Sequence, residues 1–185
     1  MVLKDVLADG GIMPVRLLRG SAGLIRFVRM RETDLPLAQQ IYNYYSLHST
    51  ATFHDASVTL EEFTGCIDTR SPEYPSFLIE ENKNLVGYCG IRRYKSLKAY
   101  DRTAEVTIYL APEHTGLGIG RAALGYLEAE ARKACIQVLI GIITGENYPS
   151  VRLFERMGYV QCARLVNVGE LSGRLLDVLF YEKEL

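Results

Sequence analysis

A glycine-rich turn in the second half of the chain, Thr115-Gly116-Leu117-Gly118-Ile119-Gly120, constrains the fold more than any other feature. Before it, residues 103–110 are mostly apolar or β-branched over the length of one strand, and after it apolar residues recur at helical spacing to about Ala134. Glycines in such a place let the backbone approach an anion, and free N–H groups at a helix start can bind a pyrophosphate. A tight turn that binds nothing explains the same glycines equally well.

Two common nucleotide-binding motifs do not fit this turn. Arg121 and Ala122 follow Gly120, where the phosphate-binding loop of ATPases needs Lys and then Ser or Thr. A dinucleotide fingerprint needs a βαβ unit. Here short loops join the strands predicted at 76–81, 85–94 and 103–110 into an antiparallel meander. The glycines alone therefore identify no ligand.

The rest of the chain alternates between strand and helix patterns. Helices are predicted from residue 33 or 34 to about 45 and from Pro149 to Gly158. A third follows the capping box of Thr59 and Glu62, with an apolar stripe of Leu60, Phe63 and Ile67. The resulting order, β-α-α-β-β-β-α-β-α-β-β, predicts an α+β domain with a mixed, mostly antiparallel sheet flanked by helices. The remaining strands are predicted at 24–30, 136–143, 159–168 and 177–183.

Length and charge exclude several classes of protein. The 185 residues suit one domain with a sizeable core. A formal net charge of −1, from 21 basic and 22 acidic side chains, argues against a nucleic-acid partner, which needs a basic field. No apolar run approaches the roughly 20 residues that a membrane helix needs, so no membrane partner is expected.

Cysteine and histidine placement predicts neither a metal site nor disulfides. No two of the 4 cysteines form a CxxC pair, and the 3 histidines are dispersed. Each cysteine lies in an apolar stretch, which favours buried thiols, and we expect a cytoplasmic protein. Residues 1–23 show neither periodicity nor a signal-peptide pattern, so we expect a poorly ordered extension before a domain at 24–185. Packing of this extension on the surface or against a partner chain stays an alternative.

The elements around the glycine turn resemble a known family. The segment from Val106 to Leu124, followed by Asn147-Tyr148-Pro149-Ser150 and Gly158-Tyr159, is similar to the coenzyme A-binding half of GNAT acetyltransferases. Their pattern is Gln/Arg-x-x-Gly-x-Gly/Ala in the turn and Asn-x-x-Ser/Ala in the next helix, and Thr115 stands where Gln or Arg is usual. The resemblance implies a GNAT-type fold that binds acetyl-CoA as cosubstrate, without a metal. The implied acetyl-CoA-binding residues are Ile108, Tyr109, Leu110, Thr115, Gly116, Leu117, Gly118, Ile119, Gly120, Arg121, Asn147 and Ser150.

A second segment narrows the resemblance. Residues 95–105, Lys-Ser-Leu-Lys-Ala-Tyr-Asp-Arg-Thr-Ala-Glu, are similar to Lys-Ala-x-x-Ala-Tyr-Asp-x-Thr-Ala-Glu of the phosphinothricin and methionine sulfone acetyltransferase group. The resemblance implies N-acetylation of the primary amine of a small amino-acid-like substrate by direct attack in a ternary complex. It also implies a homodimer, for which Tyr42, Tyr44 and Tyr45 offer aromatic surface. Leu97 stands where the phosphinothricin enzymes have Arg, so methionine sulfone or sulfoximine fits as well as phosphinothricin.

Glu105 is the candidate catalytic residue. It lies in an otherwise apolar strand, where a carboxylate needs a reason. The amine must lose a proton before it attacks the thioester, and a carboxylate can accept that proton. By resemblance Glu105 is the general base, while a salt bridge to Arg92, Arg93 or Arg102 is the structural alternative. A backbone N–H near Ile108 to Leu110 is expected to stabilise the oxyanion.

Two further positions bear on the reaction. Phe154 stands where GNAT enzymes often carry Tyr as proton donor, so Phe154 is expected to pack. Coenzyme A then leaves as the thiolate, or Tyr148 or a water supplies the proton. The residues expected to bind the substrate are Phe53, Arg93, Tyr94, Lys95 and Tyr100, with a solvated basic face as the alternative for the cations. A protein N-terminal acetyltransferase and a non-catalytic coenzyme A-binding module remain open as other functions.

Overall fold

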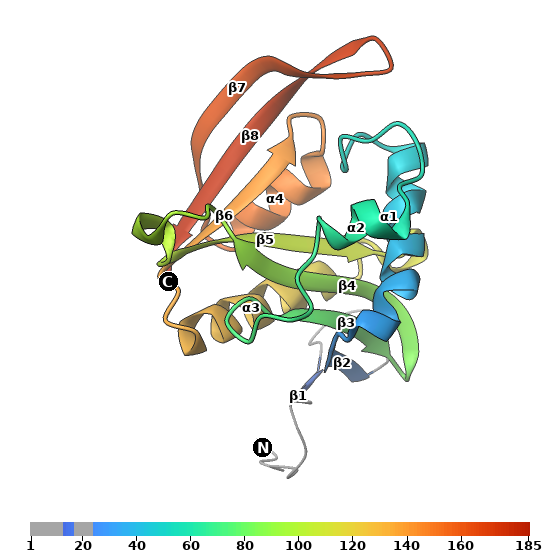
Figure 1. The fold of residues 1–185 in the computed structure, drawn as a ribbon, viewed down its shortest axis with the longest axis vertical. Coiled ribbons are helices and arrows are strands. Elements are labelled where there is room, and N and C mark those ends of the chain that lie inside the picture. Colours follow the sequence, from blue (N-terminus) through green and yellow to red (C-terminus); the bar gives the residue numbers. More distant parts are fainter. Residues whose placement is uncertain (1–12, 17–23) are drawn as a thin grey trace.

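The computed structural model describes residues 13–16 and 24–185, which form one sheet with helices on both faces (Figure 1). The described strands lie in the order β1-β2-β3-β4-β5-β6-β8-β7. β5 and β6 run parallel, and every other neighbouring pair in this order is antiparallel. The predicted α+β class with a mixed, mostly antiparallel sheet is confirmed. The strands are β1 (Met13–Arg16), β2 (Leu24–Arg29), β3 (Ser76–Glu81), β4 (Asn84–Arg93), β5 (Thr103–Leu110), β6 (Val138–Thr144), β7 (Val160–Leu171) and β8 (Arg174–Glu184).

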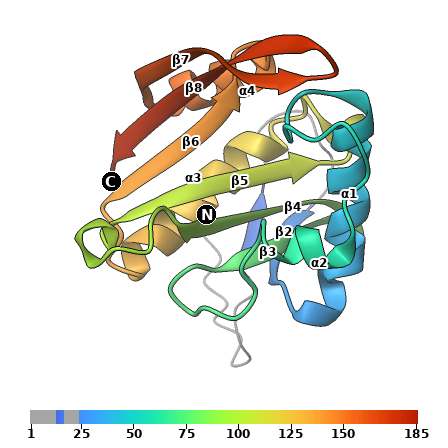
Figure 2. The same cartoon turned by 45° about the horizontal axis from the view of Figure 1, so that its top comes forward.

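Helices cover the two faces of this sheet (Figure 2). α1 and α2 pack on one face, where Tyr42 and Phe63 are buried against Tyr88 of β4. α3 and α4 pack on the other face and enclose the larger core. No helix in the described residues is both long enough and apolar enough to cross a membrane. The helices are α1 (Leu35–His48), α2 (Leu60–Thr64), α3 (Ile119–Lys133) and α4 (Tyr148–Arg156), with short 3-10 helices at Glu32–Asp34, Lys98–Tyr100 and Pro112–His114.

The central elements agree with the sequence prediction. β3 and β5 have the predicted bounds, and β4 is shifted by one residue from the predicted 85–94. The three strands form the antiparallel meander that their short loops imply. The apolar residues that recur at helical spacing after the glycine turn include Ala123, Leu124, Leu127 and Ala131 of α3, and all four are fully buried.

The last two strands are longer than the predicted 159–168 and 177–183. Asn167 has a φ of +55°, and the pairing of β7 with β8 is irregular between Leu165 and Gly169. This bulge breaks the alternation from which a strand is recognised in a sequence. The pairing resumes beyond it and ends at a turn in which Ser172 and Gly173 have φ values of +50° and +76°.

Two expectations about α2 need correction. α2 ends at Thr64, so Ile67 lies beyond the helix although it is buried. Leu60, expected on the apolar stripe of α2, is 41% exposed. Most of the extension predicted at residues 1–23 lies outside the described residues, but Met13–Arg16 pairs with β2 as β1, a strand that the sequence pattern does not predict.

A partly buried ion pair between Lys183 and Glu128 links β8 to α3. Lys183 Nζ donates to Glu128 Oε1 at 2.8 Å and to the Met157 carbonyl at 2.8 Å, and it lies 5.5 Å from the centre of the Tyr159 ring. The side chains of Lys183 and Glu128 are 22% and 9% exposed. Removing one partner of such a pair leaves the other charge poorly solvated.

We expect Glu128→Ala to lower the free energy of unfolding by about 2 kcal/mol, because it strands the Lys183 ammonium in a partly buried site. The double variant Glu128→Leu/Lys183→Met replaces both charges by apolar groups and should lose clearly less. Urea unfolding of the three proteins measures both values. A double variant that is less stable than Glu128→Ala would contradict this account.

Candidate active site

β5 and β6 pair over a short stretch and then separate. Thr103, Ala104 and Glu105 pair with residues 138–140, after which β5 continues to Leu110 and β6 to Thr144. Figure 2 shows the two strands diverging toward their carboxyl ends. The part of β5 beyond Glu105 therefore has β4 on one side and no paired strand on the other.

The backbone of Ile108 points toward this opening. The Val138 N–H donates to the carbonyl of Arg102, so the even-numbered residues of β5 direct their backbone groups toward β6. The odd-numbered residues direct their backbone groups toward β4, as the bond from the Ala111 N–H to the Val86 carbonyl just after β5 shows. Ile108 lies beyond the last pair, so its N–H and carbonyl can receive an extended, amide-bearing ligand in place of a strand.

The glycine turn brings a helix start to the same end of β5. Gly116 and Gly118 have φ values of +74° and +85°, which other residues rarely adopt. Ala122 N–H makes the first helical bond, to the Gly118 carbonyl, and Gly118 has no side chain to cap α3. The N–H groups of residues 119–121 therefore lack helical acceptors, and the positive end of the α3 dipole favours an anion there.

Glycine is needed at position 120 for helix packing rather than for the conformation of the turn. A Cβ atom at this position would lie 3.2 Å from Leu153 Cδ2 of α4. Gly120 thus lets α3 and α4 pack closely, whereas Gly116 and Gly118 supply the backbone conformation of the turn.

A cavity of about 240 Å³ lies at the open end of this region. Asn147 lines it and caps α4, with Oδ1 accepting from the Ser150 N–H at 3.3 Å. Glu146 joins two walls, because Thr50 Oγ1 donates to it at 2.9 Å and Arg174 Nη2 at 2.7 Å. The lining residues are Tyr45, Ser49, Thr50, Ala51, Glu146, Asn147 and Pro149.

Glu105 lies on β5 three residues before Ile108, on the face that α1 and α2 cover. Arg92 is directly opposite on β4, and its Nη2 donates to Glu105 Oε1 at 2.7 Å. The structural alternative considered for Glu105, a salt bridge to a neighbouring arginine, is therefore present, with Arg92 as the partner. The carboxylate still lies beside the opening, because the pairing of β5 with β6 ends at this residue.

Comparisons with known proteins agree with this geometry. The model of the acetyltransferase (GNAT) family matches residues 38–159. The chain belongs to the GNAT acetyltransferase family. It is 32% identical to the L-amino acid N-acyltransferase MnaT of Escherichia coli strain K12, over 87% of this chain and 93% of that protein.

Two solved structures are similar as well. A GNAT superfamily phosphinothricin acetyltransferase from Sinorhizobium meliloti in complex with AcCoA has a TM-score of 0.80 at 26% identity, covering 89% of each chain. A ribosomal-protein-alanine N-acetyltransferase from Brucella melitensis has a TM-score of 0.78 at 31% identity, covering 86% of this chain and 99% of that one. The predicted family, GNAT-type fold and acetyl-CoA-dependent acetyltransferase class are confirmed.

Two tyrosines at the candidate site make hydrogen bonds that the sequence does not predict, although Tyr109 itself is among the predicted acetyl-CoA-binding residues. Tyr45 Oη donates to the Leu110 carbonyl at 2.7 Å, and Tyr109 Oη donates to the Ala51 carbonyl at 3.1 Å. Burial raises the pKa of both phenols, so both stay protonated donors at neutral pH. Tyr45 belongs to a helix far away in the sequence, and its spacing carries no signal for this contact.

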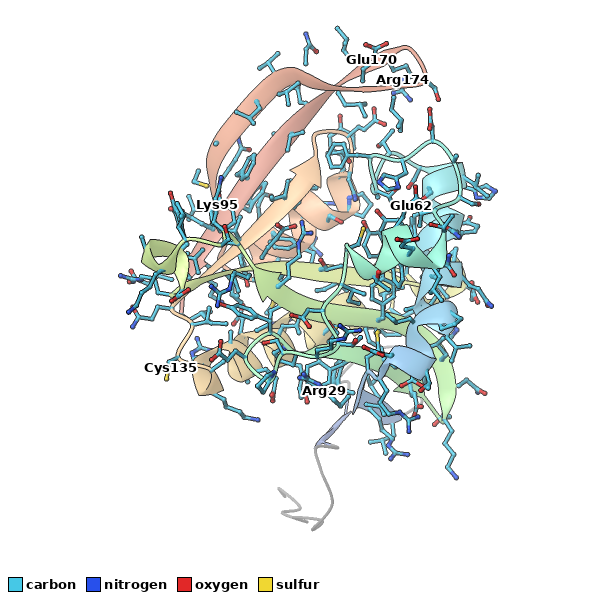
Figure 3. The ribbon with its side chains drawn as sticks, in the orientation of Figure 1. Arg29, Glu62, Lys95, Cys135, Glu170 and Arg174 are labelled. Carbon is cyan, nitrogen blue, oxygen red and sulfur yellow. The ribbon has the colours of Figure 1, made fainter. Side chains whose placement is uncertain are left out.

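The residues predicted to bind substrate lie in three places. Arg93 is on the opposite face of the sheet from Glu105, where it bonds to Asp101 at 3.0 Å and lies over the Tyr74 ring. The loop from β4 to β5 carries the others, with Tyr94 and Tyr100 in edge contact and Lys95 Nζ 5.4 Å from the Tyr94 ring centre. Figure 3 shows Lys95 at this loop, which leads into the Glu105 end of β5.

Phe53 lies elsewhere, at the β7–β8 hairpin. Its Cδ1 atom is 3.7 Å from the position of a Cβ at Gly169, and its own φ is +57°. The loop after α1 therefore reaches the hairpin and closes one side of the site. The structure does not bring Phe53 and Lys95 together.

Phe154 packs, as predicted. It is buried, and its ring lies so close to Gly141 of β6 that a Cβ at that position would clash with it. The ring also meets Tyr159 at 4.8 Å between centroids. Tyr148, a possible proton donor, is 62% exposed at the start of α4.

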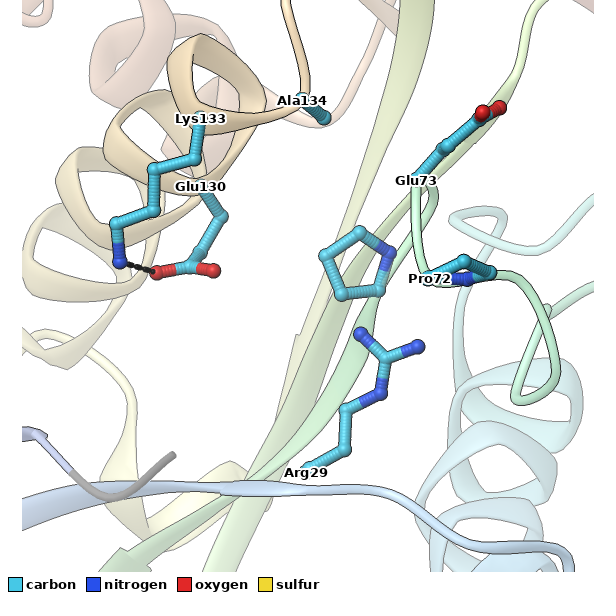
Figure 4. A pocket seen from close by; sticks show the side chains of 7 residues that line it. Arg29, Pro72, Glu73, Glu130, Lys133 and Ala134 are labelled. Atoms are coloured by element: carbon cyan, nitrogen blue, oxygen red, sulfur yellow. Dashed lines mark hydrogen bonds and ion pairs between the residues drawn. The ribbon is translucent and has the colours of Figure 1, made fainter. Parts of the chain in front are cut away.

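A second cavity, of about 290 Å³, lies on the α3 side of the sheet (Figure 4). Its charges are already matched in part, because Lys133 Nζ donates to Glu130 Oε1 at 2.6 Å and Arg29 bonds to the Ser71 carbonyl. It lies apart from the diverging strands and contributes nothing to the site described above. The described residues contain no cluster of His, Cys, Asp or Glu able to hold a metal ion.

We expect Gly118→Val to weaken acetyl-CoA binding at least about tenfold by calorimetry, because its side chain would occupy the open space at the α3 N-terminus where we expect the pyrophosphate to bind. The φ of +85° also strains any other residue, so Gly158→Val, at a φ of +83° after α4, is the control for strain. Both variants should lose stability, but Gly158→Val should keep the wild-type affinity. If the two folded variants bind acetyl-CoA with equal affinity, the glycine turn is not part of the binding site.

Proposed function

We propose that this chain transfers the acetyl group of acetyl-CoA to the primary amine of a small amino-acid-like substrate, in one ternary complex. The observation that carries the proposal is the arrangement along β5. A carboxylate at Glu105, an open backbone at Ile108 and the glycine turn follow one another on one strand and its extension. They supply a base, an oxyanion donor and an anion site in the order that the reaction needs.

The same arrangement suggests how acetyl-CoA binds. Its pyrophosphate lies at residues 115–121, where the free N–H groups of α3 begin. Its pantetheine arm extends along residues 108–110 toward Asn147, which lines the cavity, and toward Ser150 in the first turn of α4. Asn147 Oδ1 is engaged in capping α4, so its Nδ2 is the group left to donate to a pantetheine carbonyl.

Glu105 accepts the amine proton in the proposed mechanism. The amine nitrogen forms a bond to the acetyl carbon, and the Ile108 N–H stabilises the oxyanion that results. The C–S bond then breaks and sulfur leaves with the electron pair. A thiol with a reference pKa of about 8.5 is a good leaving group, so the reaction does not depend on an acid at Phe154.

The substrate proposed is an amino acid of the phosphinothricin or methionine sulfone type. Tyr94, Lys95 and Tyr100 support it, because they lie at the loop that leads into β5 near Glu105. Phe53 and Arg93 remain proposed substrate residues on the resemblance alone. Leu97 is 65% exposed and offers no charge to a phosphinate, which favours the uncharged sulfone.

Two other functions predict different results in one assay. A protein N-terminal acetyltransferase, the activity named for the Brucella melitensis neighbour, should prefer short peptides to free amino acids. A non-catalytic module should bind coenzyme A and acetylate neither. Thermal shift with acetyl-CoA, followed by thiol release with amino acids, peptides and other amines, separates the three.

We also propose a cytoplasmic homodimer. The described cysteines are free thiols, which suits a reducing compartment, although the prediction that all four are buried is wrong, since Cys135 and Cys162 are exposed and Cys66 is partly exposed. Tyr42 and Tyr45 pack inward and leave Tyr44 as the exposed tyrosine of that group. The edge strand β7 offers the better surface, because exposed apolar side chains on an edge favour association. They are Val160, Leu165, Val166 and Val168, with Leu175 on β8.

We expect light scattering to show a dimer that Val166→Lys dissociates, because a charge then replaces a side chain that is 64% exposed on β7. Leu47→Lys is the matched control, since Leu47 is 57% exposed on α1. It should stay dimeric. Dissociation by Leu47→Lys alone would place the interface on α1, and a monomeric wild type would exclude the dimer.

We expect Glu105→Gln to lower kcat/KM by about 10²–10⁴-fold at neutral pH, with acetyl-CoA affinity nearly unchanged. Gln still accepts a hydrogen bond from Arg92 but is not a base. Amino-acid amines titrate far above neutrality, so part of the loss should return at high pH, where the amine arrives deprotonated. A structural role would instead lower thermal stability and show no rescue by pH. Near-wild-type turnover of the variant at neutral pH would refute the catalytic role.

A further inference from the structure

Arg92 and Glu105 place opposite charges side by side at the proposed active site. The two residues face each other across β4 and β5, and their side chains project to the face that α1 and α2 cover. The Arg92 side chain is 41% exposed and that of Glu105 is 13% exposed. A ligand can therefore reach the guanidinium more easily than the carboxylate.

The guanidinium has donors to spare. Glu105 accepts from Nη2, while Nε is buried and has no hydrogen-bond partner among the described residues. A guanidinium carries five N–H donors, and a buried donor without an acceptor costs free energy. Because Nε is shielded, the donors left for a second carboxylate are those of Nη1 and the second N–H of Nη2, on a side chain that is 41% exposed.

Nearby arginines are engaged in other pairs. Arg93 projects to the opposite face and bonds to Asp101. Arg102 bonds to Glu184 at 3.3 Å. Arg92 is therefore the arginine of this group that shares a face with Glu105.

We propose that Arg92 binds the α-carboxylate of the substrate and so selects free amino acids, an inference that rests on the proposed acetyltransferase function. The amine and the carboxylate of an α-amino acid share one carbon atom, and the guanidinium and the Glu105 carboxylate are in contact. A carboxylate on Arg92 therefore places the amine at Glu105. Arginine suits this role because its planar donors match both oxygens of a carboxylate.

The pair also couples binding to the release of the base. When the substrate carboxylate takes guanidinium donors, it competes with Glu105 for them, and Glu105 becomes free to accept the amine proton. The C–N bond then forms, the C–S bond breaks and the electron pair leaves with sulfur. An amine without an adjacent carboxylate, such as a peptide N-terminus, leaves Glu105 held by Arg92.

The test compares the amino acid that the wild type acetylates fastest with the carboxamide of the same amino acid. Arg92→Leu should lower kcat/KM about 100-fold for the acid, mainly through KM, and should change it less than about threefold in either direction for the carboxamide. Arg92→Lys keeps the charge without the planar donors and should lose about tenfold on the acid. Each variant is compared with wild type on the same substrate, so the different amine pKa values of the two substrates cancel.

Arg102→Leu removes an arginine on the loop before β5 and should leave both substrates unaffected. Equal losses on acid and carboxamide would mean that Arg92 acts only through Glu105, and the proposal would fall. If Arg92→Leu does not fold, the acid-to-carboxamide ratio of Arg92→Lys decides in the same way. A wild type that binds acetyl-CoA but acetylates no amine would overturn the proposed function itself, whereas one that acetylates amines without preferring the acid would overturn Arg92 alone.

Discussion

The early end of the parallel pairing between β5 and β6 is the constraint on which the site depends. A strand that is paired on both sides has no backbone donors left for a ligand. β5 keeps its pairing with β4 along its whole length but loses β6 after Glu105. The core explains how the sheet tolerates this, because α3 packs against β4 and β5 while the Phe154 ring of α4 fills the space above Gly141 of β6. Because α3 covers β5 and α4 covers β6, the two strands can diverge without exposing the core.

Backbone groups rather than side chains supply most of the proposed contacts to acetyl-CoA. The N–H groups at the start of α3 and at Ile108 exist whatever the side chains are. This explains how the chain can depart from the family pattern at Thr115 and Phe154 and still belong to the family. The glycines cannot be exchanged so freely, since Gly116 and Gly118 adopt positive φ and Gly120 admits Leu153.

The sequence predicts the regular elements well and the long-range contacts poorly. The periodicity of α3 and the short loops of the meander are local signals, and both are confirmed. The continuation of β7 beyond Asn167 is not predicted, because the bulge interrupts the alternation of side chains between the two faces of the strand. The bond from Tyr45 to Leu110 joins residues 65 positions apart, which no local pattern reveals. A basic cluster at residues 92–95 is visible in the sequence, but the register of β4 with β5 decides that Arg92 shares a face with Glu105 and Arg93 does not.

That register also changes how the salt bridge of Glu105 is interpreted. Taken from the sequence, a structural ion pair and a catalytic base are competing explanations for one carboxylate. In the structure the partner of Glu105 is Arg92, whose side chain is 41% exposed and whose guanidinium makes no other hydrogen bond among the described residues, at the place where the sheet opens. A charge pair in this position holds the carboxylate in place before substrate binds and can exchange partners when a second carboxylate arrives. Pairing with Arg92 is then a condition of the proposed catalysis rather than an alternative to it, because the group that restrains the base is the same group that recognises the substrate.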